Sequence, residues 1–281
     1  MILNKFIVDD VITSALKEDL NYVDMATAFV IPEESVSTAR FLAKADGVLS
    51  GIEVALRVFT LLDDRCGFTV YKKDGDELRK GEIIAELSGP TKALLQGERT
   101  ALNLLQHMSG VATATHRAVK LVAGTNCSIA DTRKTLPGLR ALQKYAVICG
   151  GGRNHRFNLS DAAMLKDNHI DAGGGIAKTV ALLRGKVGHT VKIEVETRNM
   201  DEVKQAVAAG ADIIMLDNMT ADEMKTAVDF IAGRALTEAS GNITLENLAQ
   251  KAKSGVDIIS MGALTHSVTA MDISMKIVSE G

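Results

Sequence analysis

Cationic side chains gather in one stretch of this 281-residue chain, between Asp131 and His169. That stretch holds seven Lys and Arg residues against three Asp and Glu, although the whole chain has a formal net charge of −3. Its glycines, as in "CGGGRNHR", let backbone N–H groups approach a bound molecule closely. Arg side chains offer forked pairs of donors that match carboxylate and phosphate groups. The stretch therefore predicts an anion-binding site, with a solvated basic face as the alternative. The candidate ligands are Arg133, Lys134, Arg140, Lys144, Arg153, His155, Arg156 and Lys166.

Two acids, Glu196 and Asp217, each end a short apolar segment further along the chain. One Mg²⁺ held by one or two carboxylates and by substrate phosphates is a common arrangement, so these acids predict a magnesium site. Helix capping is the alternative role for each of them. Glu194 is expected on the same side of its strand as Glu196, because side chains alternate along a strand. Which acid reaches the metal is left open at this point.

Small residues follow two other apolar segments, in "ASGN" at Ala239–Asn242 and "SMGA" at Ser260–Ala263. Backbone N–H groups exposed there, before a helix, favour a phosphate site, and a simple tight turn is the alternative.

Other chemistry has little support. The histidines show no HExxH pattern, and the three cysteines lie far apart without a CxxC pair, so neither a zinc site nor a disulfide framework is expected.

The elements that must position these residues alternate regularly in the second half of the chain. Four apolar segments, "VKIEVET", "ADIIMLDN", "RALTEASG" and "VDIISMGA", are separated by stretches of helical periodicity that end in Gly. Such alternation is typical of βα units with parallel strands. The polar residues close each strand, and in an α/β barrel the carboxyl ends of the strands form the mouth of the active site. We predict an α/β barrel over residues 105–266.

The first part of the chain predicts a smaller α+β domain over residues 1–104. Strands and hairpins are expected in "ARFLAKADGVLSG" and in "CGFTVYKKDGDELRKGEIIAELSG", after a helix in "DDVITSALKEDL" that Asp9 and Asp10 would cap. A long helix from Thr91 to Val122 should break near Gly110. Residues 267–281 should pack back on this domain through a final helix, "TAMDISMKIVSE".

Composition excludes several classes of protein. Aromatic residues make up 4% of the chain, Trp is absent and the pI is near 6.1, so a nucleic-acid-binding surface is not expected. The N-terminal segment lacks the continuous apolar run of a signal peptide, and no stretch approaches the length of a membrane span. With three unpaired cysteines, these features predict a cytoplasmic protein.

A series of motifs resembles one family. "GERTALN", "DTRKTLPGLR", "GGGRNHR", "LKDNHI", "IEVET", "IIMLDN", "EASGN" and "ISMGALTHS" occur in the order typical of quinolinate phosphoribosyltransferases. The resemblance implies an N-terminal open α/β sandwich followed by an α/β barrel of the type II phosphoribosyltransferase kind. It also implies a transferase of NAD biosynthesis that joins quinolinate to 5-phosphoribosyl 1-pyrophosphate with Mg²⁺. The products would be nicotinate mononucleotide, pyrophosphate and CO₂.

The resemblance further implies roles for individual residues and a homodimer in which the partner's N-terminal domain completes each mouth. Arg99 would come from the neighbouring subunit. Arg133, Arg156 and Lys166 would contact the quinolinate carboxylates, with His155 nearby. Lys134 and Thr135 would lie beside the phosphoribosyl donor, and Glu196 and Asp217 would bind ribose hydroxyls and metal. The 5-phosphate would be held by Ser240, Gly241, Asn242 and Gly262. Lys134, Lys166, Glu196 and Asp217 form the expected catalytic set.

Two departures from the family pattern, "NYVDMAT" and Phe157-Asn158, lie beside these contact residues and bear on local packing. Four alternatives stay open at this point. They are a paralogue of the molybdenum-transport-associated type, a nicotinate-specific transferase, a Schiff-base aldolase that uses Lys166, and a barrel that binds phosphosugars without catalysis.

Overall fold

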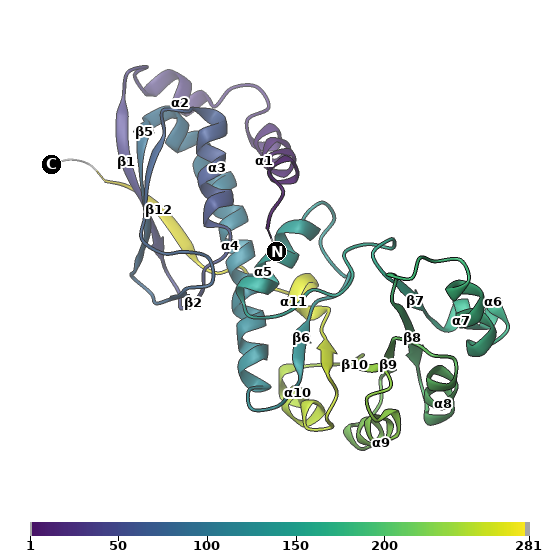
Figure 1. Cartoon of the computed structure of the whole chain (residues 1–281). Helices are drawn as coiled ribbons and strands as arrows, with labels where there is room; N and C mark the ends of the chain where they lie inside the picture. The colour runs from purple at the N-terminus through teal and green to yellow at the C-terminus, as the bar shows by residue number, and fades with distance from the viewer. Residues whose placement is uncertain (1, 279–281) are drawn as a thin grey trace. The chain divides into compact units, whose positions relative to one another are not determined.

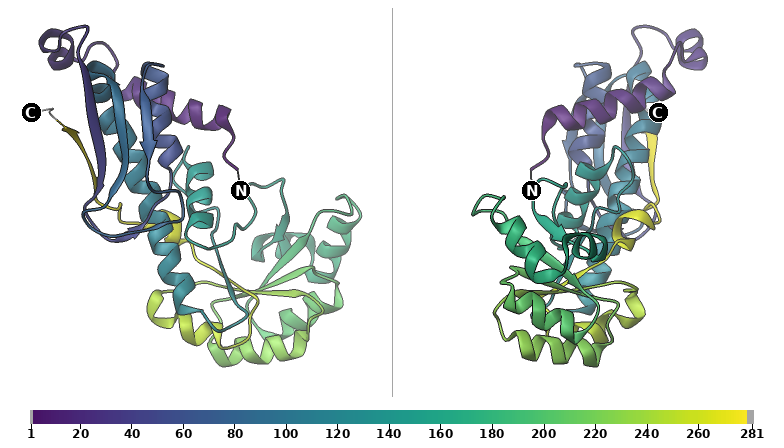
Figure 2. Two further views of the ribbon diagram at one scale, coloured as in Figure 1. Left: turned by 60° about the vertical axis from the view of Figure 1, so that its left-hand side comes forward. Right: turned by 90° about the vertical axis from the view of Figure 1, so that its right-hand side faces the viewer.

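The computed structural model describes residues 2–278, which form two compact units. Unit 1 comprises residues 2–116, 135–151 and 264–278, and unit 2 comprises Arg117–Lys134 and Gly152–Ala263 (Figures 1 and 2). The chain passes between the units four times, so neither unit is one continuous segment. Within residues 2–278, no helix combines the length and apolar character needed to cross a membrane.

Unit 1 is built on an antiparallel sheet in the order β12-β1-β5-β3. These strands are Ile273–Val278, Val36–Ala43, Ile83–Pro90 and Gly67–Val70, and a second pair joins β2 (Gly47–Val48) to β4 (Glu77–Leu78). Every second residue near the end of β1 is fully buried, and Phe41 packs against Phe59 of α3 with ring centroids 6.2 Å apart. The helices of this unit are α1 (Lys5–Asp19), α2 (Met25–Val30), α3 (Ile52–Leu62), α5 (Arg140–Cys149) and most of α4 (Thr91–Leu121) and α11 (Ala263–His266).

Unit 2 is built on a parallel sheet in the order β6-β11-β10-β9-β8-β7. The strands are Ser128–Ala130, Ile258–Ser260, Leu236–Ser240, Ile213–Asp217, Ile193–Thr197 and Ala163–Leu165. Helices α6 (Asp167–Gly173), α7 (Ile176–Arg184), α8 (Met200–Ala208), α9 (Ala221–Ile231) and α10 (Leu245–Ala252) alternate with them. The predicted α/β fold with parallel strands is confirmed. A bridge from Ala130 to Arg153 extends the sheet beyond β6, and the described residues show no ladder between Arg153 and β7, so the barrel is open there.

The long helix α4 is unbroken over its 31 residues, so the predicted break at Gly110 is wrong. A Cβ atom at Gly110 would collide with the carbonyl oxygen of Thr269 and lie 3.1 Å from the Cα of Ala270. This glycine therefore permits the 268–270 segment to pack against the helix. Glycine is needed here because of a tertiary contact, which the helix propensity of the surrounding sequence does not reveal.

Two further predictions in unit 1 are wrong in detail. Residues 273–278 form strand β12, which pairs with β1, where a helix was expected; Ser279 and Glu280 of that motif lie outside the described residues. The return of this segment to the N-terminal sheet is as predicted. Helix α1 begins earlier than expected, because Asn4 is the N-cap. Asp9 lies within the helix and pairs with Arg57, and Asp10 also lies within it.

Candidate active site

The carboxyl ends of the parallel strands of unit 2 carry most of the candidate site residues. They are Arg133 and Lys134 after β6, His155 and Arg156 after the Arg153 bridge, Lys166 after β7, Glu196 on β8, Asp217 at the end of β9, Ser240, Gly241 and Asn242 at the end of β10, and Gly262 after β11. Because parallel strands all point the same way, these residues share one edge of the sheet. Ligands bind at this edge in α/β proteins.

Strand register places Lys166 beside Glu196. Leu165 of β7 pairs with Val195 of β8, so the next residues of the two strands are neighbours. The Lys166 ammonium lies 2.9 Å from Oε2 of Glu196 and forms an ion pair with it. The Lys166 side chain is 46% exposed, whereas the Glu196 side chain is 14% exposed. The Lys166 ammonium is therefore accessible to a ligand, while the more buried Glu196 carboxylate holds it in position through the ion pair.

Asp217 lies one strand further along, and the charges of both Lys166 and Glu196 influence its pKa. Burial raises the pKa of Asp217, and the nearby negative charge of Glu196 raises it further. A hydrogen bond from Asn218 and the charges of Lys166 and Lys134 act in the opposite direction without cancelling the rise. A partly buried acid whose charge is disfavoured by a second acid nearby provides a suitable place for a cation or for hydroxyl donors.

The loop after β10 contacts the residues that follow β9. Asn218 donates from Nδ2 to Oδ2 of Asp217 at 2.6 Å and accepts from Nδ2 of Asn242 at 2.9 Å. Gly241 has φ +84°, and a Cβ atom there would lie 2.8 Å from Oδ1 of Asp217. Only glycine fits both requirements, namely a left-handed backbone and a close approach. Ser240, Gly241 and Asn242 are named the phosphate loop below, because they match the predicted phosphate site.

Arg133 and Arg156 lie near each other on the opposite side of the opening in the sheet. Burial lowers the pKa of Arg156, and the positive charge of Arg133 lowers it further, while Glu194 raises it. The Nη1 group of Arg156 donates to the carbonyl of Ala162 at 2.9 Å, which orients the guanidinium. Like charges held together in this way disfavour each other until an anion binds between them. This pair therefore fits a ligand with carboxylate groups.

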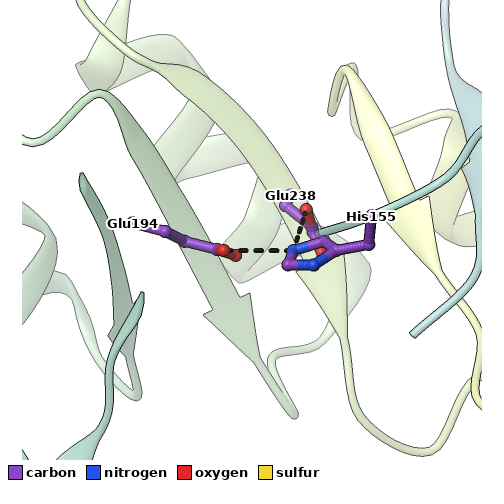
Figure 3. Close-up of side chains that lie close together, drawn as sticks. All are labelled: His155, Glu194 and Glu238. Atoms are coloured by element: carbon purple, nitrogen blue, oxygen red, sulfur yellow. Dashed lines mark ion pairs between the residues drawn. The ribbon is translucent and has the colours of Figure 1, made fainter. Parts of the chain in front are cut away.

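A buried cluster lies beneath this edge, made of His155, Glu194 and Glu238 (Figure 3). Nε2 of His155 lies 3.0 Å from Glu194 and 3.4 Å from Glu238, and both acid side chains are at most 2% exposed. Burial, the largest influence, lowers the pKa of His155, but the hydrogen bonds and charges of the two acids outweigh it and raise that pKa to about 10. The imidazole is therefore positively charged at neutral pH.

The same three residues could also share a metal ion, since their ligand atoms lie within 4.8 Å of one another. A metal would need the neutral imidazole, because a protonated ring nitrogen has no electron pair to offer. The strongly raised pKa of His155 means that a proton competes well for that position. The geometry therefore favours a buried ion-pair cluster over a metal centre.

The backbone N–H of His155 also donates to the fully buried Asp131 at 2.8 Å, which fixes the segment before Arg156.

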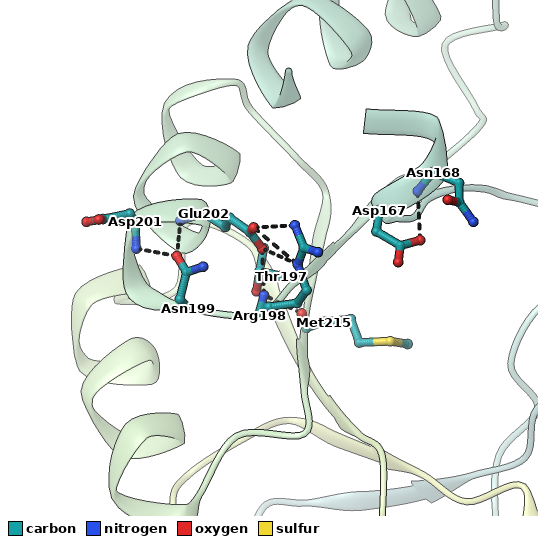
Figure 4. Close-up of polar contacts among 8 residues, drawn as sticks. All are labelled: Asp167, Asn168, Thr197, Arg198, Asn199, Asp201, Glu202 and Met215. Atoms are coloured by element: carbon teal, nitrogen blue, oxygen red, sulfur yellow. Dashed lines mark hydrogen bonds and ion pairs between the residues drawn. The ribbon is translucent and has the colours of Figure 1, made fainter. Parts of the chain in front are cut away.

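Not every cation at this edge is available to a ligand. Arg198 follows β8 and pairs with Glu202 in the first turn of α8, with Nη2 2.8 Å from Oε1, while Asn199 caps the helix (Figure 4). The side chain of Thr197 donates to the carbonyl of Met215 at 2.8 Å and ties β8 to β9. These contacts hold the strand end that carries Glu196.

The remaining candidates belong to unit 1. Thr135 accepts a hydrogen bond from Arg140 at 3.0 Å, Lys144 is fully buried on α5, and Arg99 is exposed on α4. Glu238 was not among the residues predicted from the sequence. An acid in the buried middle of the strand "LTEAS" was the available signal, since a buried charge requires a partner. Glu194 was placed on the same strand face as Glu196, but its pairing with His155 was not foreseen.

Comparison with known proteins gives a consistent result. Family models for the N-terminal and C-terminal domains of quinolinate phosphoribosyl transferase match residues 24–109 and 111–276. A probable nicotinate-nucleotide pyrophosphorylase [carboxylating] of Bacillus subtilis is 47% identical, with 92% of this chain and 90% of that protein covered. A probable enzyme of the same name from Synechocystis is 43% identical, with 97% and 93% covered. The crystal structure of NadC from Streptococcus pyogenes superposes with a TM-score of 0.96 at 42% identity and covers 99% of both chains.

Proposed function

Because the chain belongs to the quinolinate phosphoribosyltransferase family, we propose that it makes nicotinate mononucleotide from quinolinate and 5-phosphoribosyl 1-pyrophosphate, with release of pyrophosphate and CO₂. The arrangement that carries the proposal is the alternation of charge along one sheet edge. Arg133 and Arg156 lie on one side of the opening in the sheet. Across the opening, Lys166, Glu196 and Asp217 follow one another on neighbouring strands, and Lys166 forms an ion pair with Glu196.

We assign the cations to the pyridine dicarboxylate. The two carboxylates of quinolinate lose their hydration on binding, which requires positively charged partners in the site. Arg133 and Arg156 offer forked donors, and Lys166 offers a compact charge that Glu196 holds in place. His155, which is held by its ion pairs with Glu194 and Glu238, supports these cations from beneath.

The acids serve the sugar side of the reaction. As the ring nitrogen of quinolinate forms its bond to C1 of the ribose, the bond from C1 to pyrophosphate breaks and positive charge develops on the sugar. Glu196 and Asp217 stabilise that charge and accept hydrogen bonds from ribose hydroxyls. Lys134 and Thr135 are assigned to the phosphoribosyl donor, and the phosphate loop and Gly262 to its 5-phosphate.

Decarboxylation follows from the same site. Once the ring nitrogen is glycosylated, it is positively charged. When CO₂ departs, the electron pair left at C2 therefore lies beside a cationic nitrogen, which stabilises it. C2 then takes up a proton. The Lys and Arg side chains around the ring add further electrostatic stabilisation. This route needs no covalent nucleophile. A Schiff base on Lys166 is disfavoured, because an ammonium in an ion pair has no free electron pair for attack on a carbonyl.

Mg²⁺ belongs to the proposal, with Glu196 and Asp217 as its protein ligands. The fit rests on Asp217, whose pKa is raised by burial and by the charge of Glu196, so that a cation between them would relieve the repulsion. When bound, the metal neutralises the pyrophosphate that leaves.

We also propose that the enzyme is a homodimer in the cytoplasm. Arg99 is exposed on α4 of unit 1, and we assign it to the site of the partner subunit. Cys66, Cys127 and Cys149 are free thiols, which suits a reducing compartment.

The test is direct. Purified protein is incubated with quinolinate, 5-phosphoribosyl 1-pyrophosphate and Mg²⁺, and nicotinate mononucleotide, pyrophosphate and CO₂ are measured together. Equal amounts of the three products are expected, with strong loss of turnover in EDTA. Turnover of nicotinate in place of quinolinate would instead identify a nicotinate-specific transferase. Donor binding without CO₂ would identify a non-catalytic protein.

A further inference from the structure

Asn218 occupies an unusual position between the acid at the end of β9 and the phosphate loop after β10. Its backbone is left-handed, with φ +56°, and its N–H donates to the carbonyl of Ser240 at 3.0 Å. Its side chain donates to Asp217 at 2.6 Å and accepts from Asn242 at 2.9 Å. One residue thus contacts two assigned parts of the site through three hydrogen bonds.

The backbone conformations strengthen this observation. In the described residues, Asn218, Ala232 and Asn242 are the non-glycine residues with positive φ. Ala232 ends helix α9, where a left-handed residue is common. The other two are joined side chain to side chain at adjacent strand ends. Backbone strain held in place by surrounding contacts tends to concentrate at functional sites.

Neighbouring contacts fix both ends of this link. Lys251 of α10 donates to the carbonyl of Met219, the residue after Asn218, at 3.2 Å. Asn247, near the start of the same helix, donates to the carbonyl of Asn242 at 2.9 Å. Helix α10 therefore holds both segments. The close approach of Gly241 to Asp217 leaves little room for the segments to move apart independently.

We propose that Asn218 is a positioning residue that couples Asp217 to the phosphate loop. Binding of the 5-phosphate orders Asn242, Asn242 orients the carboxamide of Asn218, and that carboxamide aims Asp217 at the ribose. The inference rests on the proposed roles of Asp217 and Asn242. It adds a requirement that the two parts act together.

The experiment compares variants that remove side chains without adding strain. Asn218→Gly and Asn242→Gly accept a left-handed backbone freely, and Ala232→Gly is the matched control at the third such position. Steady-state kinetics are measured with each substrate varied, and melting temperatures are measured in parallel. For Asn218→Gly we expect kcat/KM for 5-phosphoribosyl 1-pyrophosphate to fall about tenfold, while KM for quinolinate changes less than twofold. Ala232→Gly should match the parent enzyme.

The double variant tests the coupling itself. If both residues act through their shared hydrogen bond, Asn218→Gly with Asn242→Gly should lose at least threefold less activity than the product of the single losses. Losses that multiply would overturn the coupling. So would an Asn218→Gly enzyme that melts at a lower temperature but has normal kinetic constants well below its melting point, because its role would then be structural.

Two reference variants separate this inference from the proposed function. Asp217→Asn and Asn242→Gly remove groups assigned directly to the donor substrate. If both retain near-normal kinetics, the assignment of the site is wrong and the coupling falls with it. If both are impaired while Asn218→Gly is normal, the assignment stands and the coupling alone is refuted.

Discussion

The protonation of His155 offers a sharp test of the buried cluster. We expect replacement of Glu238 by Gln to lower the pKa of His155, because the variant keeps the shape of the side chain but removes one of the two negative charges beside Nε2. The pKa of Glu194, now raised by burial and by the charge of Glu238, should fall in the same variant.

The size of the effect follows from the contacts. His155 has a pKa of about 10 against an ordinary value of 6.5, and each pKa unit corresponds to about 1.4 kcal/mol. A nearby opposite charge typically shifts a pKa by about 1–3 units, so the variant should titrate between about pH 7 and 9.

The sign of the stability effect is set by the raised pKa. The folded protein holds the proton of His155 more tightly than the unfolded chain, so this interaction stabilises the fold fully below pH 6.5. It is lost as the pH rises from 6.5 towards 10. Between pH 7 and 9 the parent protein should lose about 2–3 kcal/mol of unfolding free energy through this group, and the variant should lose less.

The assay is NMR of protein labelled with ¹⁵N-histidine, in which six histidines give resolvable ring signals. His155→Gln identifies the signal by its absence, and denaturant unfolding at several pH values supplies the stabilities. Glu34→Gln, an exposed acid in unit 1, is the matched control and should leave the His155 titration unchanged. Titration of His155 near pH 6.5 in the parent protein, or no change in Glu238→Gln, would refute the reasoning.

Three other predictions address the site and the fold. Lys166→Ala and Arg133→Ala should each reduce turnover at least a thousandfold with unchanged circular dichroism, and near-normal turnover in either would remove it from the site. Arg99→Ala mixed with Lys166→Ala and allowed to exchange subunits should regain about a quarter of parent activity, because half of the dimers would contain one intact site; no recovery would contradict a shared site. Gly110→Ala should lower the unfolding free energy by about 1–3 kcal/mol despite the better helix propensity of Ala, since its Cβ meets the Thr269 carbonyl, and a more stable variant in chemical denaturation would show that the contact yields easily.

The βα half of the fold was predictable because its signals are local. Each parallel strand is buried and reads as a short apolar run, and each helix between them carries its own periodicity, so the strands around Ile193, Ile213 and Ile258 follow from the sequence. The polar residue at a strand end marks the site edge for the same reason. Glu196 and Asp217 were predicted at this edge in this way, and both lie at the ends of their strands.

Apart from the start of α1, which the local N-cap Asn4 sets, the failures involve partners distant in the sequence. Gly110 is required by a segment about 160 residues away, and β12 is a strand because β1 supplies its hydrogen bonds. The role of Asp9 depends on Arg57, and the position of His155 depends on acids of two different strands. A sequence pattern indicates which structure a segment favours on its own. The roles of these residues depend instead on contacts that form only in the folded chain.

The pairing of β12 with β1 has a consequence for synthesis in the cell. Ala43 pairs with Ile273, 230 positions later, and translation at about 10 residues per second separates their emergence from the ribosome by about 20 seconds. During that interval the nascent chain carries β1 with one side of its backbone unsatisfied, a state in which strands readily join other chains. Products that terminate before residue 273 never gain this cover, and we expect them to aggregate or be degraded, whereas a polypeptide that includes residues 273–278 covers this edge of β1 with β12.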